Sequence, residues 1–361
     1  MTVARLDVGG MRRIAVFRAL QLGDLLCSVP ALRALRKAAP QARITLIGLP
    51  WASSFVERFA MYVDDFMMFP GHPGMPETDP QPQAMPRFLA EARARGFDLA
   101  LQLHGSGGLT NPLTLSLGAG RSAGFYLAGE PCPDPGTFAL WDPREHEVLR
   151  YLRLLWRLGI PPQGEHLEFP LRQSDRAELG CVLRGLQAGS YVCIHPGARL
   201  PSRRWPPQRF AEAADCLAKA GLSVIVTGSA DEQPLTSAVL EAMQAPAIDL
   251  TGRTSLGALA ALISRARLLV CNDTGVSHVA AAVGTSSIVV CSGADPGRWA
   301  PLDWRRHHVL YADVPCRPCV HAVCPIGHPC ALGVGTGKVL EAARRLCGDL
   351  MLHHSVTRAG P

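Results

Sequence analysis

The feature that most constrains the fold is a strand–loop–helix pattern that runs through the chain twice. In the first half, strands are predicted near residues 13–17, 44–47, 66–69 and 97–103, and helices near 25–38, 84–95 and 145–158. In the second half, strands are predicted near 191–194, 222–227, 268–271 and 287–290, and helices near 207–220, 231–243, 255–266, 274–283 and 336–347. Alternating strands and helices build parallel sheets that helices cover on both faces. The pattern therefore predicts an α/β protein with two Rossmann-like domains, which we expect to face each other across a cleft.

The length of 361 residues agrees with two domains. A stretch over 159–170 that contains Pro161-Pro162 is typical of a linker. We therefore expect one domain over 1–165, a second over 166–345 and a tail over 346–361. The helix predicted over 336–347 is expected to cross back to the first domain. The apolar face of the helix predicted over 145–158 is formed by Val148, Leu149, Leu152, Leu155 and Trp156.

Composition excludes several classes of protein. Apolar residues make up 48% of the chain and charged residues 18%, which excludes a disordered chain. The net charge of +6 suits an anionic small ligand or an anionic membrane surface better than a nucleic acid. The longest uncharged runs, 99–120 and 274–294, contain polar residues and glycines and do not predict a membrane span. No targeting segment stands out, so we expect a cytoplasmic protein without a nucleic-acid partner.

The loop after the first strand carries a candidate catalytic carboxylate. Residues 19–26 leave the predicted strand at its carboxyl end, where ligands bind in parallel α/β sheets. Asp24 stands near the start of the next helix. Two interpretations stay open: Asp24 caps the helix, or it serves as a general base.

The loop after the first strand of the second half is basic. His195-Pro196-Gly197 is followed by Arg203-Arg204. Two adjacent arginines beside a glycine-rich turn can clamp a diphosphate, although a solvated basic loop is the alternative. Trp205 is predicted to be a packing anchor.

A third loop joins a buried strand to a helix at Asp273-Thr274-Gly275. The free N–H groups of the helix favour an anion, with which the Asp273 carboxylate would compete. Asp273 is therefore expected to hold sugar hydroxyls, while capping by Asp273 or Thr274 remains the alternative. His278 is either a structural histidine or a ligand contact.

Two glycine-rich segments and a cysteine cluster complete the motifs. Residues 118–123 match a dinucleotide fingerprint without a strand before them, and 333–338 fall short of a P-loop, so both are rejected. The spacing of Cys316, Cys319, Cys324 and Cys330 fits zinc, disulfides or free thiols, in a segment expected to lie away from the three loops. The cysteines in apolar strands are expected to be buried: Cys193, Cys271 and Cys291.

Together these loops resemble glycosyltransferase family 9, the lipopolysaccharide heptosyltransferase family, over about residues 12–346. The motifs that carry the resemblance are Leu22-Gly23-Asp24 with Pro30-Ala31-Leu32, His195-Pro196-Gly197 with Arg203-Arg204-Trp205-Pro206, Gly228 with Glu232, Leu250-Thr251-Gly252 before Ser255-Leu256, and Asp273-Thr274-Gly275 with Ser277-His278. The resemblance implies a GT-B fold and an inverting, metal-independent transfer of heptose from ADP-heptose to a lipopolysaccharide core acceptor, without a cofactor. It also implies a lipid-linked glycan acceptor at the inner face of the inner membrane, and we expect a monomer.

The resemblance also implies roles for individual residues. Asp24 corresponds to the aspartate taken as the base. Arg203 stands where the family often has a lysine that contacts the donor phosphate. Residues expected to bind the donor are His195, Pro196, Gly197, Arg204, Gly228, Glu232, Thr254, Ser255, Leu256, Asp273, Thr274, Gly275 and His278. Residues expected to bind the acceptor are Gln21, Gly23 and His104.

Other functions compete with this one. The chain could use another nucleotide sugar or another glycan acceptor, or it could bind a sugar nucleotide without catalysis. The presence of both Asp24 and Arg203 weakens the non-catalytic alternative. An oxidoreductase-like epimerase is disfavoured, because none of the five tyrosines has a lysine four residues later.

Overall fold

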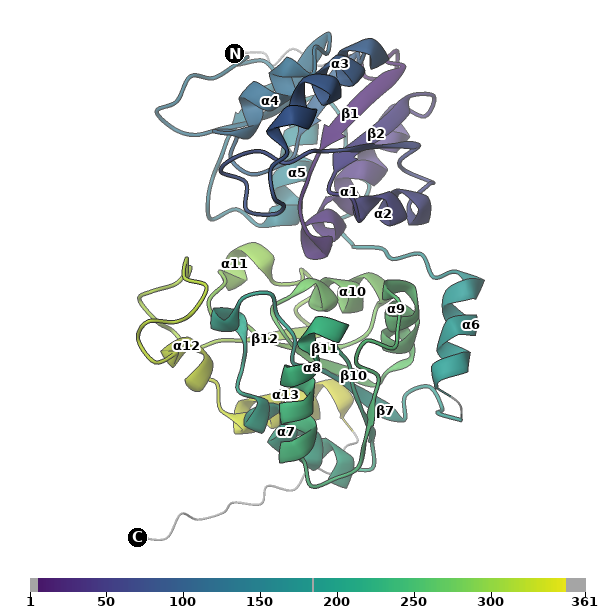
Figure 1. Ribbon diagram of the computed structural model, residues 1–361, viewed down its shortest axis with the longest axis vertical. Coiled ribbons are helices and arrows are strands. Elements are labelled where there is room, and N and C mark those ends of the chain that lie inside the picture. Colours follow the sequence, from purple (N-terminus) through teal and green to yellow (C-terminus); the bar gives the residue numbers. More distant parts are fainter. Residues whose placement is uncertain (1–5, 184, 349–361) are drawn as a thin grey trace. The chain divides into compact units, whose positions relative to one another are not determined.

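The computed structural model describes residues 6–183 and 185–348 (Figure 1). The chain divides into two compact units, Met1–Pro170 and Leu171–Pro361. The expected boundary at 165/166 therefore lies five residues before the division. The segment 159–170 runs without regular structure, and Arg33 and Arg58 bind its carbonyls at Gln163 and Pro170. Beyond residue 348, the expected tail over 346–361 lies outside the described residues.

The first unit is built on a parallel six-stranded sheet in the order β3-β2-β1-β4-β5-β6. Its strands are β1 (Arg13–Phe17), β2 (Arg43–Gly48), β3 (Asp65–Met68), β4 (Leu99–Gln102), β5 (Arg121–Tyr126) and β6 (Phe138–Leu140). Its helices are α1 (Leu22–Ala38), α2 (Ala52–Arg58), the short 3-10 helix η1 (Pro82–Ala84), α3 (Met85–Arg95), α4 (Thr110–Ser116) and α5 (Glu147–Arg157).

Alternation along β1 explains why helices cover both faces of this sheet. Side chains of a strand point alternately to its two faces, and Ile14 to Phe17 are all buried. Ala15 and Phe17 pack in a core with Phe88 and Ala92 of α3. Helices α1 and α5 pack against each other. The sheet is therefore a buried, predominantly apolar layer, as expected of a parallel sheet.

The second unit repeats this architecture with a parallel sheet in the order β12-β11-β10-β7-β8-β9. Its strands are β7 (Tyr191–His195), β8 (Ser223–Val226), β9 (Ala247–Asp249), β10 (Leu268–Asn272), β11 (Ser287–Val290) and β12 (His307–Leu310). Its helices are α6 (Gln173–Val182), η2 (Pro201–Arg203), α7 (Pro207–Lys219), η3 (Ala230–Glu232), α8 (Gln233–Ala242), α9 (Leu256–Arg265), α10 (Gly275–Val283), α11 (Pro296–Trp299), α12 (Pro329–Leu332) and α13 (Thr336–Cys347).

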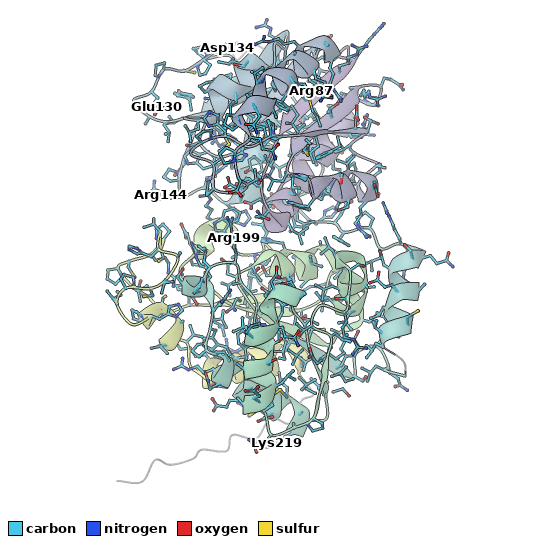
Figure 2. All side chains as sticks on the ribbon, viewed as in Figure 1. Arg87, Glu130, Asp134, Arg144, Arg199 and Lys219 are labelled. Carbon is cyan, nitrogen blue, oxygen red and sulfur yellow. The ribbon has the colours of Figure 1, made fainter. Side chains whose placement is uncertain are left out.

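Both sheets have the same strand order when each unit is numbered from its own first strand. In such sheets, ligands bind beyond the carboxyl ends of the strands where the order reverses. That point lies between β1 and β4 in the first unit and between β7 and β10 in the second. Figure 2 labels Arg199, just after β7, and Lys219, at the end of α7, at opposite ends of the second unit. The expectation of an α/β protein with two Rossmann-like units is confirmed.

Three local expectations are wrong. Helix α13, expected to cross back to the first domain, is part of the second unit, because its buried residues Val339, Ala342 and Ala343 belong to the core around β7 and α7. Trp156 is 62% exposed, since the buried face of α5 includes Tyr151 and Leu154 instead. Helix α1 begins at Leu22 rather than Leu25. Within the described residues, no helix is long and apolar enough to cross a bilayer.

Candidate functional site

The carboxyl edge of the first sheet holds Asp24 beside a buried arginine. Asp24 is the third residue of α1, and Gln21 occupies the cap position. Asp24 is therefore not the N-cap residue of this helix. A carboxylate in the first helical turn is still favoured by the helix dipole. Arg18, which directly follows β1 and is fully buried, places Nη2 3.7 Å from Oδ1 of Asp24 and donates from Nε to the Asp24 carbonyl at 2.8 Å.

Arg18 is the centre of a buried network that the sequence did not predict. Its Nη1 donates to the carbonyl of Leu103, just after β4, and to the hydroxyl of Tyr151. Its Nη2 lies 3.5 Å from the carboxylate of Glu147, which also accepts from Tyr151 and from Arg150. Burial works against the charge of Arg18, but these oxygens and Asp24 more than offset it and raise the pKa of Arg18. The one signal in the sequence was a charged residue placed directly after an apolar strand.

His104 lies on the same edge, next to the start of the first loop. Its Nδ1 accepts from the backbone N–H of Ala19 at 3.2 Å, and its ring stacks on Phe17. Burial and then the charge of Arg18 lower the pKa of His104 to about 3. His104 is therefore neutral, with its proton on Nε2. Gln21 and Gly23 lie in the first turn region of α1, so three predicted acceptor residues are brought to one edge with Asp24.

At the carboxyl edge of the second sheet, His195 and Glu232 come together over a glycine. His195 ends β7, its Nδ1 lies 3.1 Å from the Thr227 hydroxyl, and its Nε2 lies 3.9 Å from Glu232. Burial, partly opposed by Glu232, lowers the pKa of His195. The Glu232 carboxylate leans on Gly197, where a Cβ would lie 2.2 Å from Oε1. Only glycine allows this approach.

Asn272, the last residue of β10, joins two of the predicted loops. Its Oδ1 accepts from the backbone N–H of Trp205 at 2.9 Å, and its Nδ2 donates to the carbonyl of Pro196 at 2.7 Å. Trp205 is fully buried and donates from Nε1 to the Val334 carbonyl, which confirms its role as a packing anchor. The loop that carries the arginines is therefore fixed at the point where the strand order reverses.

The two arginines of that loop have different partners. Arg203 ends η2 and donates from Nη2 to the carbonyl of Cys319 at 3.1 Å. Arg204 donates from Nε to the carbonyl of Ala198, within its own loop, at 2.9 Å.

The contact with Cys319 overturns one expectation. Residues 312–332, which we call the Cys-rich segment, were expected to lie away from the predicted loops. Instead, Ser202 binds the carbonyls of His321 and Ala322, and His328 donates to the Ser202 carbonyl. The thiols Cys316, Cys319, Cys324 and Cys330 are free, and the described part of the chain contains no group of three or more residues that could hold a metal. The Cys-rich segment therefore packs against the loop that carries Arg203 and Arg204.

The third loop begins α10 with an uncapped turn. Thr274 occupies the cap position, and its side chain makes no capping bond within the described residues. The Asp273 carboxylate lies 4.0 Å from the Cys291 thiol, whose pKa burial raises to about 12. His278 is buried on α10, with its ring edge-on to Trp299. The N–H of Ser277 donates to the Thr274 carbonyl, and the N–H groups of Gly275 and Val276 belong to the first turn of α10, where a helix favours an anion.

The remaining predicted donor residues lie on the next loops of the same sheet. The carbonyl of Gly228 accepts from Gly252. Ser255 caps α9 by accepting from the N–H of Ala258, and it also binds Glu178 of α6 through its hydroxyl and its N–H. Its hydroxyl is therefore already engaged in the fold. Thr254 and Leu256 flank this cap.

The buried cysteines and the rejected motifs agree with expectation. Cys193, Cys271 and Cys291 are buried in or directly after strands of the second sheet. The segment 118–123 follows α4 and enters β5, and 333–338 joins α12 to α13. Neither joins a strand to a helix, so neither has the context of a phosphate-binding loop.

Comparison with known proteins places this architecture in a family. A family model for glycosyltransferase family 9 (heptosyltransferase) matches residues 137–329, more than half of the chain. The chain belongs to glycosyltransferase family 9. Among relatives, lipooligosaccharide heptosyltransferase 2 of Haemophilus influenzae is 33% identical over 171 residues, 43% of this chain and 49% of that protein. Lipopolysaccharide heptosyltransferase 2 of Salmonella typhimurium is 34% identical over 167 residues, 43% of this chain and 48% of that protein. The chain spans about half the length of the curated relatives it matches.

Solved structures of family 9 members share the fold over nearly the whole chain. A family 9 glycosyltransferase from Veillonella parvula superposes with a TM-score of 0.75 at 22% identity, over 96% of this chain and 99% of that chain. The ADP-heptose lipopolysaccharide heptosyltransferase II of Escherichia coli superposes with a TM-score of 0.72 at 21% identity, over 93% and 98%. The expected GT-B fold is confirmed.

Proposed function

We propose that this family 9 member transfers a heptose from ADP-heptose to a lipopolysaccharide core acceptor. Two observations carry the proposal, one in each unit: Asp24 lies beside Arg18 at the carboxyl edge of the first sheet, and Arg203 and the start of α10 lie at the carboxyl edge of the second. The names of the relatives support the choice of heptose, and the Escherichia coli heptosyltransferase II is named for ADP-heptose. The first unit would take the acceptor and the second the donor.

In this proposal one displacement inverts the anomeric centre. An acceptor hydroxyl attacks the anomeric carbon of the heptose while the bond from that carbon to the diphosphate oxygen breaks. The hydroxyl proton passes to the Asp24 carboxylate, which acts as general base. The charge that develops on the departing ADP is stabilised by Arg203 and by the N–H groups at the start of α10. Protein groups thus supply the positive charge that a metal ion would otherwise provide.

The other donor residues have matching roles in the proposal. Glu232, whose carboxylate lies against Gly197, would accept hydrogen bonds from the hydroxyls of the nucleoside. Asp273 would accept hydrogen bonds from the hydroxyls of the sugar. The acceptor would be a lipid-linked glycan at the inner face of the inner membrane, so the enzyme would work in the cytoplasm as a monomer bound peripherally.

The function is tested with a donor panel and one variant. Calorimetry should show tight binding of ADP-heptose, and weaker binding of UDP-sugars and GDP-sugars. Asp24→Asn should lower turnover about 10²–10⁴-fold with donor affinity unchanged. Asp134→Asn, on the exposed loop before β6, is the matched control and should keep full turnover.

Two results would contradict the proposal. Tight binding of a UDP- or GDP-sugar alone would show that the donor is wrong. Full turnover in Asp24→Asn would show that another group takes the proton.

A further inference from the structure

Arg18 is the most completely buried charge at the edge that carries Asp24. Its side chain is 0% exposed, so it cannot touch a bound substrate. One nitrogen, Nη2, faces two carboxylates: Asp24 at 3.7 Å and Glu147 at 3.5 Å. The guanidinium charge is therefore divided between a partly exposed carboxylate and a buried one.

The remaining bonds of Arg18 fix where that charge stands. Nε donates to the backbone carbonyl of Asp24, and Nη1 to the carbonyl of Leu103 and the hydroxyl of Tyr151. These acceptors belong to α1, to the segment after β4 and to α5. The planar fork of an arginine satisfies all of them at once, which a lysine could not do.

Five groups face the Arg18 guanidinium from the packed elements, and they determine its electrostatics. Asp24 and Cys27 come from α1, Glu147 and Tyr151 from α5, and His104 from the segment after β4. Burial raises the pKa of Tyr151, so the phenol stays protonated and donates to Glu147. His104 is neutral. The two negative groups that compete for Arg18 are therefore Asp24 and Glu147, and Glu147 is shared with a second buried cation, Arg150 of α5, whose Nη1 lies 3.1 Å from its Oε2.

We propose that Arg18 is a positioning residue for the base and that Glu147 tunes it by drawing part of the Arg18 charge away from Asp24. This inference rests on the proposed function of Asp24 as the general base. Arg18 orients the first turn of α1 through the Asp24 carbonyl and stabilises the ionised carboxylate. Glu147 keeps that stabilisation moderate, so that Asp24 remains basic enough to take a proton. A carboxylate held by an undivided charge would be a weaker base.

The test uses two substitutions that act in opposite directions. Glu147→Gln keeps the shape of the side chain and removes the competing charge, so the acid limb of kcat/KM against pH should move down by about half a unit to one unit. Arg18→Met removes the shared charge, so the limb should move up by about one unit or more, with at least a tenfold lower kcat. Glu145→Gln is the matched control, because Glu145 pairs with Arg153 and not with Arg18.

A second readout does not depend on turnover. The Asp24 carboxyl signal, assigned in a ¹³C NMR spectrum by its loss in Asp24→Asn, should titrate with the same two displacements. A merely structural role for Arg18 and Glu147 would lower stability in both variants without moving the titration in opposite directions. If Arg18→Met does not fold, Glu147→Gln decides the question alone.

The outcomes separate this inference from the proposed function. The tuning role is overturned if Glu147→Gln leaves both the acid limb of kcat/KM against pH and the titration of the Asp24 carboxyl signal unchanged, even when Asp24→Asn is inactive. Displacement in the same direction in both variants also overturns it. Full activity of Asp24→Asn overturns the base and the positioning role together.

Discussion

At the residue scale, Arg18 in the first unit and Asn272 in the second have the same structural role: each binds backbone groups beyond the ends of the central strands. Strands β1 and β4, like β7 and β10, pair up to their carboxyl ends at the point where the strand order reverses, and backbone groups beyond those ends have no ladder partners. Arg18 satisfies the carbonyl of Leu103, and Asn272 satisfies the carbonyl of Pro196 and the N–H of Trp205. Buried backbone groups need such partners. Each candidate edge thus contains one polar side chain that binds the backbone of a neighbouring segment: Arg18 binds Leu103 after β4, and Asn272 binds Pro196 and Trp205 after β7.

His104 makes the stability of the protein depend on pH. Its pKa is about 3 in the folded state and about 6.5 when unfolded, so between these values the unfolded chain binds a proton that the folded chain does not. Stability therefore falls by about 1.4 kcal/mol for each unit of pH lost within that window. Replacing His104 by Asn keeps an acceptor for the Ala19 N–H and removes the titration.

The measurement is urea unfolding at pH 7 and at pH 5. The wild-type protein should lose about 2 kcal/mol more between these pH values than His104→Asn. Buried His307, whose pKa is lowered to about 4, should leave a residual slope in the variant. His321→Asn is the control, because His321 is exposed. Equal slopes in wild type and His104→Asn would show that His104 is charged in the folded protein.

At the scale of elements, the Cys-rich segment fixes the position of the loop that carries Arg203 through hydrogen bonds. Cys319 donates its N–H to Gly293 and offers its carbonyl to Arg203, and a Cβ at Gly293 would lie only 2.8 Å from that of Cys319. Arg317 ties the segment to the loop after β11 through the carbonyls of Cys291 and Ala294. Two loops far apart in the chain therefore position one arginine.

This arrangement predicts different effects for the two neighbouring arginines. Arg203→Ala should weaken ADP binding about tenfold or more, because a charge-assisted bond to the diphosphate is worth ~1.5–3 kcal/mol. Arg204→Ala should have a smaller effect on ADP binding, since Arg204 bonds within its own loop. Calorimetry with ADP, together with the melting temperature of each variant, measures both. A larger loss of affinity in Arg204→Ala would reverse the assignment.

How far the sequence could predict these elements depends on where their determinants lie. The strand over 13–17 and the helix over 336–347 follow from local apolar periodicity, and both have the predicted bounds. The start of α1 was missed because no residue there carries a capping signal, and Gln21 caps without its side chain. Short strands such as β6 and β9 have too few residues to show a period. They exist because neighbouring strands pair with them.

The site could be predicted only in part, because some of its determinants are local in the sequence and others are not. Loops that follow strongly apolar strands were found, because their place at the carboxyl edge follows from the α/β pattern. The contacts of Arg203 with Cys319, and of Arg18 with Glu147, join residues more than a hundred positions apart. No local pattern encodes such a pairing. The same holds for the domain boundary, which lies after residue 170 because unit-one side chains bind the linker.

At the scale of the whole molecule, the donor edge is expected to work without a divalent metal. In the proposed function, the positive charge comes from Arg203 and the partial positive charge from the N–H groups at the start of α10, while the carboxylates Asp273 and Glu232 bind hydroxyls. A metal-dependent site would need carboxylates that converge on the diphosphate. Transfer should therefore be unchanged after treatment with EDTA, with the melting temperature followed in parallel. Loss of turnover at an unchanged melting temperature, restored by Mg²⁺, would contradict this mechanism.

Two units with one strand order, each with its own core and its own edge of loops, can diverge at different rates. The family match begins only at residue 137 and covers β6, α5 and most of the second unit. Under the proposed division of labour, a change of acceptor requires changes only in the loops of the first unit, because the loops that take the donor belong to the second. New members can then arise by replacing loops of one Rossmann unit while the other is inherited intact.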